Sequence, residues 1–130
     1  MKTTWVNGTF DILHVGHIEM LKYAASISPI LIVGIDSDRR VKELKGKNRP
    51  INNQEDRKKI LEAIKYVSSV VIFDTDEELE NYLKEFNIYS MVEGSEYKNK
   101  RIIGKELVKK ILFFDRIPKY SSTKIIKNIN

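Results

Sequence analysis

Short apolar runs alternate along this chain with segments in which apolar side chains recur at helical spacing. The runs are rich in branched residues and are bounded by polar or glycine-containing stretches, a pattern typical of buried strands. The sequence predicts five such strands, at residues 3–7, 30–36, 70–73, 90–92 and 111–114.

The segments between the strands have the periodicity of amphipathic helices. They predict helices at 17–28, 53–66 and 76–86, and a last helix that begins at Ser121 or Ser122. Two helix starts carry pairs at the spacing of a capping box, Asn52 with Glu55 and Thr75 with Glu78. The stretch LKGKNRP at 44–50 has no apolar periodicity and is expected to be a flexible connection.

Strands that alternate with helices favour a parallel sheet joined by right-handed crossovers. We therefore expect a three-layer α/β fold with a five-stranded parallel sheet, in one domain over residues 1–130. Ligands of such sheets bind beyond the carboxyl ends of the strands. The loops that follow the predicted strands are accordingly where a functional site is expected.

Composition narrows the class of protein. The chain has 130 residues, a formal net charge of +5 and no cysteine, which excludes a disulfide framework and a cysteine nucleophile. The longest apolar run, at 29–35, is too short to span a bilayer, and the amino terminus is unlike a signal peptide, so we expect a cytoplasmic protein without a membrane partner.

The charge is unevenly distributed. Residues 98–130 hold ten Lys or Arg against two acidic side chains, whereas residues 1–97 hold 13 basic and 16 acidic ones. A basic C-terminal third suggests an anionic ligand or a solvated lysine-rich face. It lacks the aromatic interleaving of many nucleic-acid-binding surfaces, and we expect no nucleic-acid partner.

The stretch VNGTFDILHVGH at 6–17 contains both histidines of the chain. Gly8 follows the first strand, where the chain turns sharply and backbone can approach a ligand. A helix N-terminus offers unpaired N–H groups and a partial positive charge, and His14 and His17 add side-chain donors beside Gly16. These features suit phosphoryl or nucleotidyl transfer.

Two other interpretations of this turn stay open at this point. The histidines with Asp11 could ligate a metal ion, although three ligands so close in sequence lack the usual wide spacing. The histidines could also be structural residues whose hydrogen bonds hold the turn.

Three further stretches place polar groups near the predicted strand ends. Lys45 and Arg49 flank Gly46 after the second strand, and Arg57 lies near the start of the following helix. EGSEY at 93–97 follows the fourth strand, and the hydroxyls of YSSTKII at 120–126 mark another helix start. The loops thus bring Gly, His, Lys, Ser and Thr toward one region.

These motifs resemble a known family. GTFDILHVGH at 8–17 matches the G-x-F-D-x-x-H-x-G-H signature of the cytidylyltransferase-like nucleotidyltransferases, and SSTKII at 121–126 is similar to their second signature. LKG at 44–46 is similar to the lysine-bearing loop of the same family. The resemblance covers essentially the whole chain and implies a Rossmann-like nucleotidyltransferase fold of the HxGH type.

The resemblance also implies roles for particular residues. The catalytic residues would be His14, His17 and Lys45. The nucleotide would be bound by Gly8, Thr9, Phe10, Gly16, Gly94, Glu96, Tyr97, Ser121, Ser122 and Thr123. The acceptor, or the loops around it, would be oriented by Asp11, Arg49, Arg57 and Arg116.

Two branches of the family compete for the substrates. The stretches NGTFDILHVGH, LKGKNRPIN, EGSEYKNKRIIGKELV and SSTKIIKNI resemble the adenylyltransferase domain of ADP-heptose synthase, which uses ATP and a heptose 1-phosphate. GTFD, HVGH, STKI and the position of Arg116 resemble glycerol-3-phosphate cytidylyltransferase, which uses CTP. Archaeal FAD synthetases share the first motif.

We favour the heptose branch, because GSEY at 94–97 is closer to its Gly-Gly-Asp-Tyr. Mg²⁺ is the expected cofactor, held mainly by phosphates and not by a protein cluster. Family members are often dimers, so the resemblance allows for a homodimer. A nucleotide-binding sensor without turnover is the alternative outside the enzymes.

Overall fold

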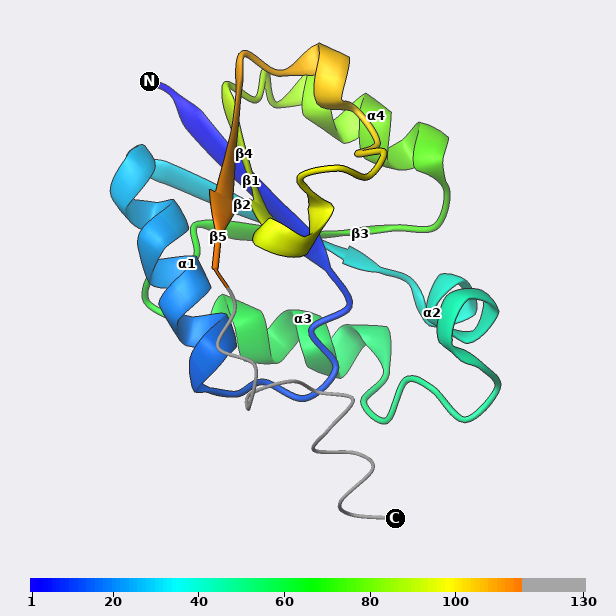
Figure 1. Cartoon of the computed structure of the whole chain (residues 1–130). Coiled ribbons are helices and arrows are strands. Elements are labelled where there is room, and N and C mark those ends of the chain that lie inside the picture. The colour runs from blue at the N-terminus through cyan, green and yellow to red at the C-terminus, as the bar shows by residue number, and fades with distance from the viewer. Residues whose placement is uncertain (116–130) are drawn as a thin grey trace.

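The computed structural model describes residues 1–115 and contains a five-stranded parallel sheet (Figure 1). The strand order is β3-β2-β1-β4-β5, with every neighbouring pair parallel. The strands are β1 (Thr3–Gly8), β2 (Ile30–Asp36), β3 (Ser69–Phe73), β4 (Ser90–Gly94) and β5 (Lys110–Phe114). The predicted α/β fold and all five strands are confirmed.

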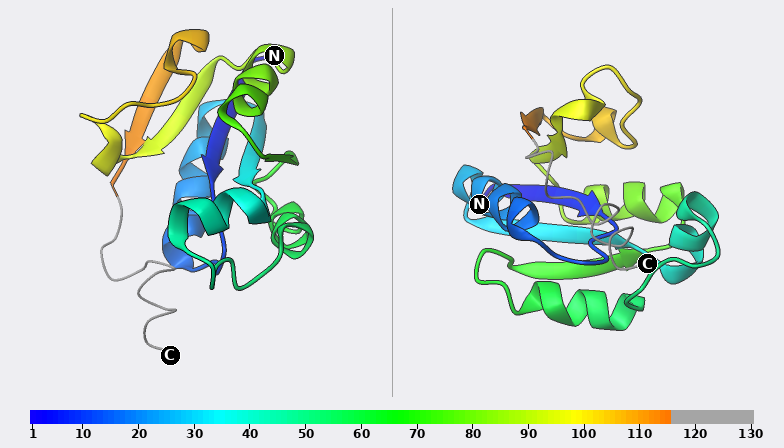
Figure 2. Two further views of the ribbon diagram at one scale, coloured as in Figure 1. Left: turned by 90° about the vertical axis from the view of Figure 1, so that its right-hand side faces the viewer. Right: turned by 60° about the horizontal axis from the view of Figure 1, so that its bottom comes forward.

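Helices cover both faces of this sheet (Figure 2). On one face α1 (Val15–Ile27) and α3 (Gln54–Glu62) contribute Leu21 and Leu61 to a buried cluster with alternate strand residues. On the other, α4 (Asp76–Glu85) contributes Leu79 and Leu83, and two short 3₁₀ helices, η1 (Ser95–Tyr97) and η2 (Lys105–Leu107), lie between β4 and β5. The three layers that the sequence predicts are therefore present.

One helix was not expected. The flexible connection predicted for 44–50 begins inside α2 (Asp38–Lys45), so Lys45 is the last residue of a helix. The Ser37 hydroxyl accepts from the Arg40 N–H at the start of this helix, and Gly46, at φ 108°, ends it. Only Val41 of α2 is buried, so the helix has almost no apolar periodicity by which the sequence could reveal it.

The predicted caps are confirmed in one case and wrong in the other. The Thr75 hydroxyl caps α4 by accepting from the Glu78 N–H at 3.1 Å. The cap of α3 is Asn53, and not Asn52. The helix also ends at Glu62, four residues before the predicted end. The predicted last helix and Arg116 lie outside the described residues.

Gly34 of β2 makes room for the largest side chain of the core. A Cβ at Gly34 would lie 2.3 Å from Cζ2 of Trp5, whose side chain is fully buried on the neighbouring strand β1. The Trp5 Nε1–H in turn donates to Oδ1 of Asn7 at 3.0 Å, near the carboxyl end of that strand. The missing side chain at Gly34 thus supports the position of a polar residue at the site described below.

We predict that Gly34→Ala destabilises the protein by about 1–3 kcal/mol, because a buried methyl group that overlaps an indole ring forces both strands to move. Urea unfolding followed by far-UV circular dichroism measures the loss. In a Trp5→Phe background the same substitution is expected to cost less, since the smaller ring vacates part of the space. An equal cost in both backgrounds would contradict the packing argument.

The order of the strands reverses between β1 and β4. The chain adds β2 and β3 on one side of β1 and then returns to add β4 and β5 on the other side. The β1–β4 ladder is short, pairing Thr4 with Ser90 and Trp5 with Met91. Open α/β sheets bind ligands at the carboxyl end of such a switch point. Within the part of the chain described, no helix combines the length and apolar character needed to cross a membrane.

Candidate functional site

The first motif forms a tight turn at the carboxyl end of β1. Phe10 adopts a left-handed conformation, with φ 50°, and is buried at 5% exposure. Its ring packs over Gly8, where a Cβ would lie only 3.1 Å from Phe10 Cε2. A side chain at position 8 would press against the Phe10 ring, so glycine lets the ring lie across the end of the strand, which gives a physical reason for G-x-F at this position.

The two histidines form the start of α1. His14 is the N-cap and His17 is the third helical residue, and their rings stack with centroids 3.9 Å apart. The Nδ1 atom of His17 accepts from the backbone N–H of His14 at 3.3 Å. An imidazole that accepts through Nδ1 carries its proton on Nε2 when neutral, so His17 offers an Nε2–H donor. Gly16 lies between them at the helix N-terminus, as the sequence predicts.

Asp11 holds this turn against the loop that follows α2. Its buried carboxylate accepts from Arg49 Nε at 3.1 Å and from the backbone N–H groups of Ile51 and Asn52, each at 2.8 Å. The Asn52 side chain returns a bond to the Asp11 carbonyl at 2.8 Å. With its oxygens committed in this way, Asp11 has a structural role in positioning the two loops.

Arg57 has a comparable role on the other side of the turn. Its side chain is 1% exposed and makes four hydrogen bonds. The guanidinium donates to the carbonyls of Thr9 and Asp36 at 2.9 and 2.8 Å, which joins the ends of β1 and β2. Of the two roles expected for Arg57, orienting loops is the one that these contacts match.

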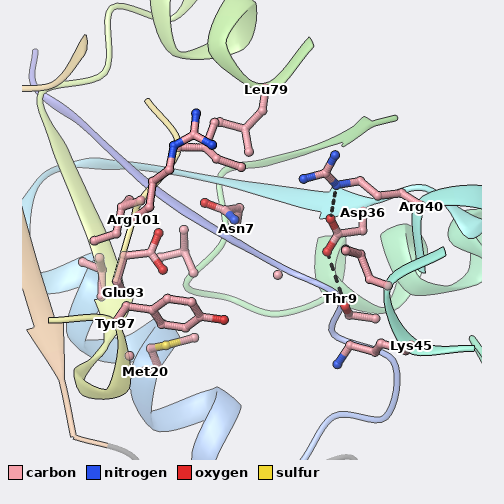
Figure 3. A pocket seen from close by; sticks show the side chains of 17 residues that line it. Asn7, Thr9, Met20, Asp36, Arg40, Lys45, Leu79, Glu93, Tyr97 and Arg101 are labelled. Atoms are coloured by element: carbon pink, nitrogen blue, oxygen red, sulfur yellow. Dashed lines mark hydrogen bonds and ion pairs between the residues drawn. The ribbon is translucent and has the colours of Figure 1, made fainter. Parts of the chain in front are cut away.

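A pocket of about 280 Å³ opens beyond the carboxyl ends of β1, β2 and β4 (Figure 3). Its walls come from these strand ends, α1, α2, α4 and the connection after β4, and its lining contains both polar and apolar residues. They are Val6, Asn7, Gly8, Thr9, Met20, Asp36, Arg40, Leu44, Lys45, Leu79, Val92, Glu93, Gly94, Tyr97, Arg101, Ile102 and Ile103.

The pocket brings together some of the residues predicted from the sequence and not others. Gly8, Thr9, Lys45, Gly94 and Tyr97 line it. The lining does not include His14, His17, Phe10, Gly16, Asp11, Arg49, Arg57 or Glu96. Ser121, Ser122, Thr123 and Arg116 lie outside the described residues. The pocket is thus one part of the site, adjacent to the turn that carries the histidines.

Sequence reasoning missed several polar lining residues. Trp5, Gly34 and Met91 lie on the face of the sheet that α4 covers. Asn7, Asp36 and Glu93 lie two positions after them on the same strands, in that order. Because side chains alternate along strands, all three point to one side of the sheet at its carboxyl end. The alternation of side chains along each predicted strand could therefore have identified these three residues from the sequence.

The remaining missed residues, Arg40 and Arg101, had no such signal. Arg40 lies on the unpredicted helix α2, and Arg101 lies on the irregular connection between β4 and β5.

Glu93 is the titratable group whose environment is most unusual. Burial, together with the neighbouring carboxylate of Glu96, raises the pKa of Glu93 to about 7. Its side chain takes part in none of the hydrogen bonds or ion pairs found among residues 1–115. The Glu96 carboxylate folds back over the α-carbon of Gly94, where a Cβ would lie 2.4 Å from Glu96 Oε2.

We predict that Glu93 lowers stability as the pH rises. The folded chain keeps the Glu93 proton up to about pH 7, whereas the unfolded chain loses it near pH 4.5, so unfolding releases a proton between these values. The free energy of unfolding therefore falls across this window and levels off above pH 7. Glu93→Gln is expected to be more stable than the parent at pH 8, by on the order of 2–3 kcal/mol.

Urea unfolding at pH 4.5 and pH 8 measures this difference, which is expected to be small at the lower pH. Glu85→Gln, the same substitution at an exposed position of α4, is the matched control and should change neither value. A Glu93→Gln variant without any pH-dependent gain would show that the carboxyl is solvated in the folded chain.

The residues present do not form a protein metal centre in the described range. No group of three or more His, Cys, Asp or Glu side chains there is arranged to hold a metal ion. In this structure the Asp11 oxygens are committed to Arg49 and two backbone N–H groups, so a metal bound by His14, His17 and Asp11 would have to replace these bonds.

The fold and this turn place the chain among the α/β proteins that bind ligands at a topological switch point. Comparison with known proteins gives the narrower class. A family model described as cytidylyltransferase-like matches residues 5–128, and the chain belongs to this family.

Several curated relatives share the name Bifunctional protein HldE. The protein from Campylobacter fetus subsp. fetus is 46% identical over 125 residues, which cover 96% of this chain and 27% of that protein. The protein from Helicobacter hepaticus is 41% identical over 128 residues, which cover 98% of this chain and 26% of that protein. The chain therefore spans about a quarter of the length of these relatives.

A solved structure supports the fold. The lipopolysaccharide core biosynthesis protein from Thermoplasma volcanium GSS1 superposes with a TM-score of 0.74 over 88% of this chain and 98% of that one. The sequence identity is 23%, so this similarity concerns the fold alone.

Proposed function

We propose that this chain is a nucleotidyltransferase that transfers AMP from ATP to D-glycero-D-manno-heptose 1-phosphate, forming ADP-heptose and pyrophosphate. The observation that carries the proposal is the capped turn at the start of α1, where stacked His14 and His17 lie at the switch point beside the pocket. The choice of heptose rests on the sequence resemblance and on the relatives named HldE.

In the proposed reaction a phosphate oxygen of the sugar phosphate attacks the α-phosphorus of ATP. A new P–O bond forms as the bond from the α-phosphorus to the oxygen bridging the β-phosphorus breaks, and that oxygen leaves with pyrophosphate. His17, through its Nε2–H donor, and His14 would stabilise the charge that develops on the α-phosphate and leaving group. Lys45 would hold the acceptor phosphate close to the nucleotide, so that positioning contributes much of the rate.

Mg²⁺ remains a proposal. When bound, it would bridge and neutralise polyphosphate oxygens, keeping mostly water and phosphate as ligands. The α1 N-terminus and the two histidines fit this arrangement, because they offer hydrogen-bond donors to the phosphates that would hold the metal.

Pyrophosphate release tests the proposal directly. ATP and CTP are each combined with D-glycero-D-manno-heptose 1-phosphate and with glycerol 3-phosphate, in the presence of Mg²⁺. We expect turnover with ATP and the heptose only, and no turnover after chelation of Mg²⁺. Turnover only with CTP and glycerol 3-phosphate would assign the chain to the other branch. ATP binding without release in any combination would favour a nucleotide sensor. The homodimer stays a prediction that sedimentation can test.

A further inference from the structure

The two sides of the pocket differ in charge. Figure 3 shows Lys45, Thr9, Asp36 and Arg40 on one side, with Glu93, Arg101 and Asn7 on the other. Arg40 is neutralised, because Nε pairs with Asp36 and Nη2 with Asp76, each at 2.8 Å. Lys45 therefore attracts an anionic group to its side of the pocket, and above about pH 7 the ionised Glu93 opposes the attraction of Arg101 on the other side.

Glu93 is an unusual residue to find in such a wall. It is 9% exposed, and among residues 1–115 no hydrogen bond or ion pair satisfies its carboxyl group, although the guanidinium of Arg101 lines the same pocket. Burying a carboxyl without a partner destabilises a protein. An uncompensated polar group of this kind at a pocket wall is therefore well placed to bind a ligand.

Asn7 supplies a complementary group next to Glu93. The ladder between β1 and β4 ends at Trp5 and Met91, and Asn7 and Glu93 each lie two residues beyond it and line the pocket. The Asn7 Oδ1 atom accepts from Trp5 Nε1 at 3.0 Å, which leaves the amide NH₂ to donate. A hydrogen-bond donor and a carboxyl group thus line the same side of the pocket (Figure 3).

We propose that Asn7 and Glu93 form the hydroxyl-binding end of the pocket and select the uncharged, polyhydroxylated part of the acceptor. A hydroxyl group both donates and accepts, so it can satisfy Glu93 and Asn7 together, whereas a phosphate offers only acceptors to a carboxylate. The acceptor phosphate is then directed to Lys45. This inference rests on the proposed function, because it assigns the pocket to the acceptor of that reaction.

The size of the pocket favours the acceptor over a whole nucleotide, although Gly8, Thr9, Gly94 and Tyr97, which the family resemblance assigns to the nucleotide, also line it. Its volume of about 280 Å³ lies just below the usual range for ligand pockets, about 300–1,000 Å³, which suits one small ligand. His14 and His17, to which the nucleotide phosphates are assigned, are not among its lining residues. The nucleotide would therefore lie over α1, with the acceptor in the pocket.

The test compares Glu93→Leu and Asn7→Leu with the parent chain and with Glu85→Gln as an exposed control. Calorimetric titrations use heptose 1-phosphate, inorganic phosphate and ATP. In both variants we expect heptose 1-phosphate to bind at least about tenfold more weakly, the loss of a hydrogen bond to a ligand hydroxyl. Inorganic phosphate and ATP should bind as in the parent or, for Glu93→Leu, phosphate slightly more tightly. The acceptor KM in the pyrophosphate assay should rise in parallel, with the KM for ATP unchanged.

Two results would overturn the inference. Heptose 1-phosphate affinity that is unchanged in Glu93→Leu would show that the carboxyl does not contact the acceptor. Weakened ATP binding with unchanged heptose 1-phosphate binding would assign the pocket to the nucleotide. Failure of the proposed function would appear differently, as absent pyrophosphate release in the parent chain. The calorimetric titrations would still decide whether Glu93 and Asn7 bind the acceptor. Urea unfolding confirms that each variant is folded before it is titrated.

Discussion

His17→Ala is expected to lower turnover by about two to three orders of magnitude, the loss typical of removing one donor that stabilises transition-state charge. ATP affinity should fall by less than about tenfold, or roughly 1.4 kcal/mol, because backbone groups at the helix start still bind the phosphates. Pyrophosphate release gives the first quantity and calorimetric titration of ATP gives the second. Equal losses in turnover and in binding would contradict a transition-state role.

His17 also has a structural function that must be separated from the catalytic one. Its Nδ1 accepts from the N–H of His14, so alanine removes both a cap and the Nε2–H donor. Asparagine at position 17 can keep the cap, because its Oδ1 takes the place of Nδ1, but it has no donor at the position of Nε2. We expect His17→Asn to be as stable as the parent and nearly as inactive as His17→Ala. Full activity in His17→Asn would show that the histidine acts only by holding the turn.

Arg57→Ala is expected to reduce the free energy of unfolding by about 3–5 kcal/mol, a large share of the roughly 5–15 kcal/mol that stabilises a domain of this kind. The substitution leaves the carbonyls of Thr9, Asp36 and Asn52 without their donor in the interior. It also removes the 2.8 Å ion pair with Asp38. Urea unfolding measures the loss, and pyrophosphate release should fall with it because the turn after β1 is no longer fixed.

Arg39→Ala is the matched control. Arg39 is an exposed arginine that pairs with Glu43 and Asp74 at the surface, so its removal should leave the unfolding midpoint nearly unchanged. Arg57→Lys, which retains the charge but not the planar fork of donors, should fall between the parent and Arg57→Ala. An Arg57→Ala protein with normal stability and a raised acceptor KM would instead support direct contact between Arg57 and the acceptor.

The sheet could be predicted from the chain because its strands are continuous apolar runs, as parallel strands covered on both faces must be. Helix α2 could not, because it is held by its caps and by the ion pairs of Arg40 with Asp36 and Asp76. Periodicity reports burial, and a helix with one buried residue offers little of it. The same limit explains why Lys45 was expected on a loop and lies at a helix end.

The candidate site also has one part that the sequence predicted and another part that only the structure revealed. The local sequence was sufficient for the turn from Gly8 to His17, since its conformation depends on residues that are close along the chain: a ring over a glycine, a cap, and a side chain that bonds three residues back. Asp11 and Arg57 were singled out as functional residues, but only the structure shows that their hydrogen bonds are internal. What they bind lies some 20–50 positions away in the sequence.

By itself the sequence determined the α/β class, the switch-point turn and the family to which the chain is similar, because each is recorded in a short pattern of apolar residues or in a contiguous motif. Only the tertiary structure decided that Asn7 and Glu93 lie on one side of a pocket, with Asp36 and Lys45 across from them. These residues come from different strands and a helix, and their proximity follows from strand order and register. Those properties arise when the sheet assembles, and no single stretch of the chain contains them.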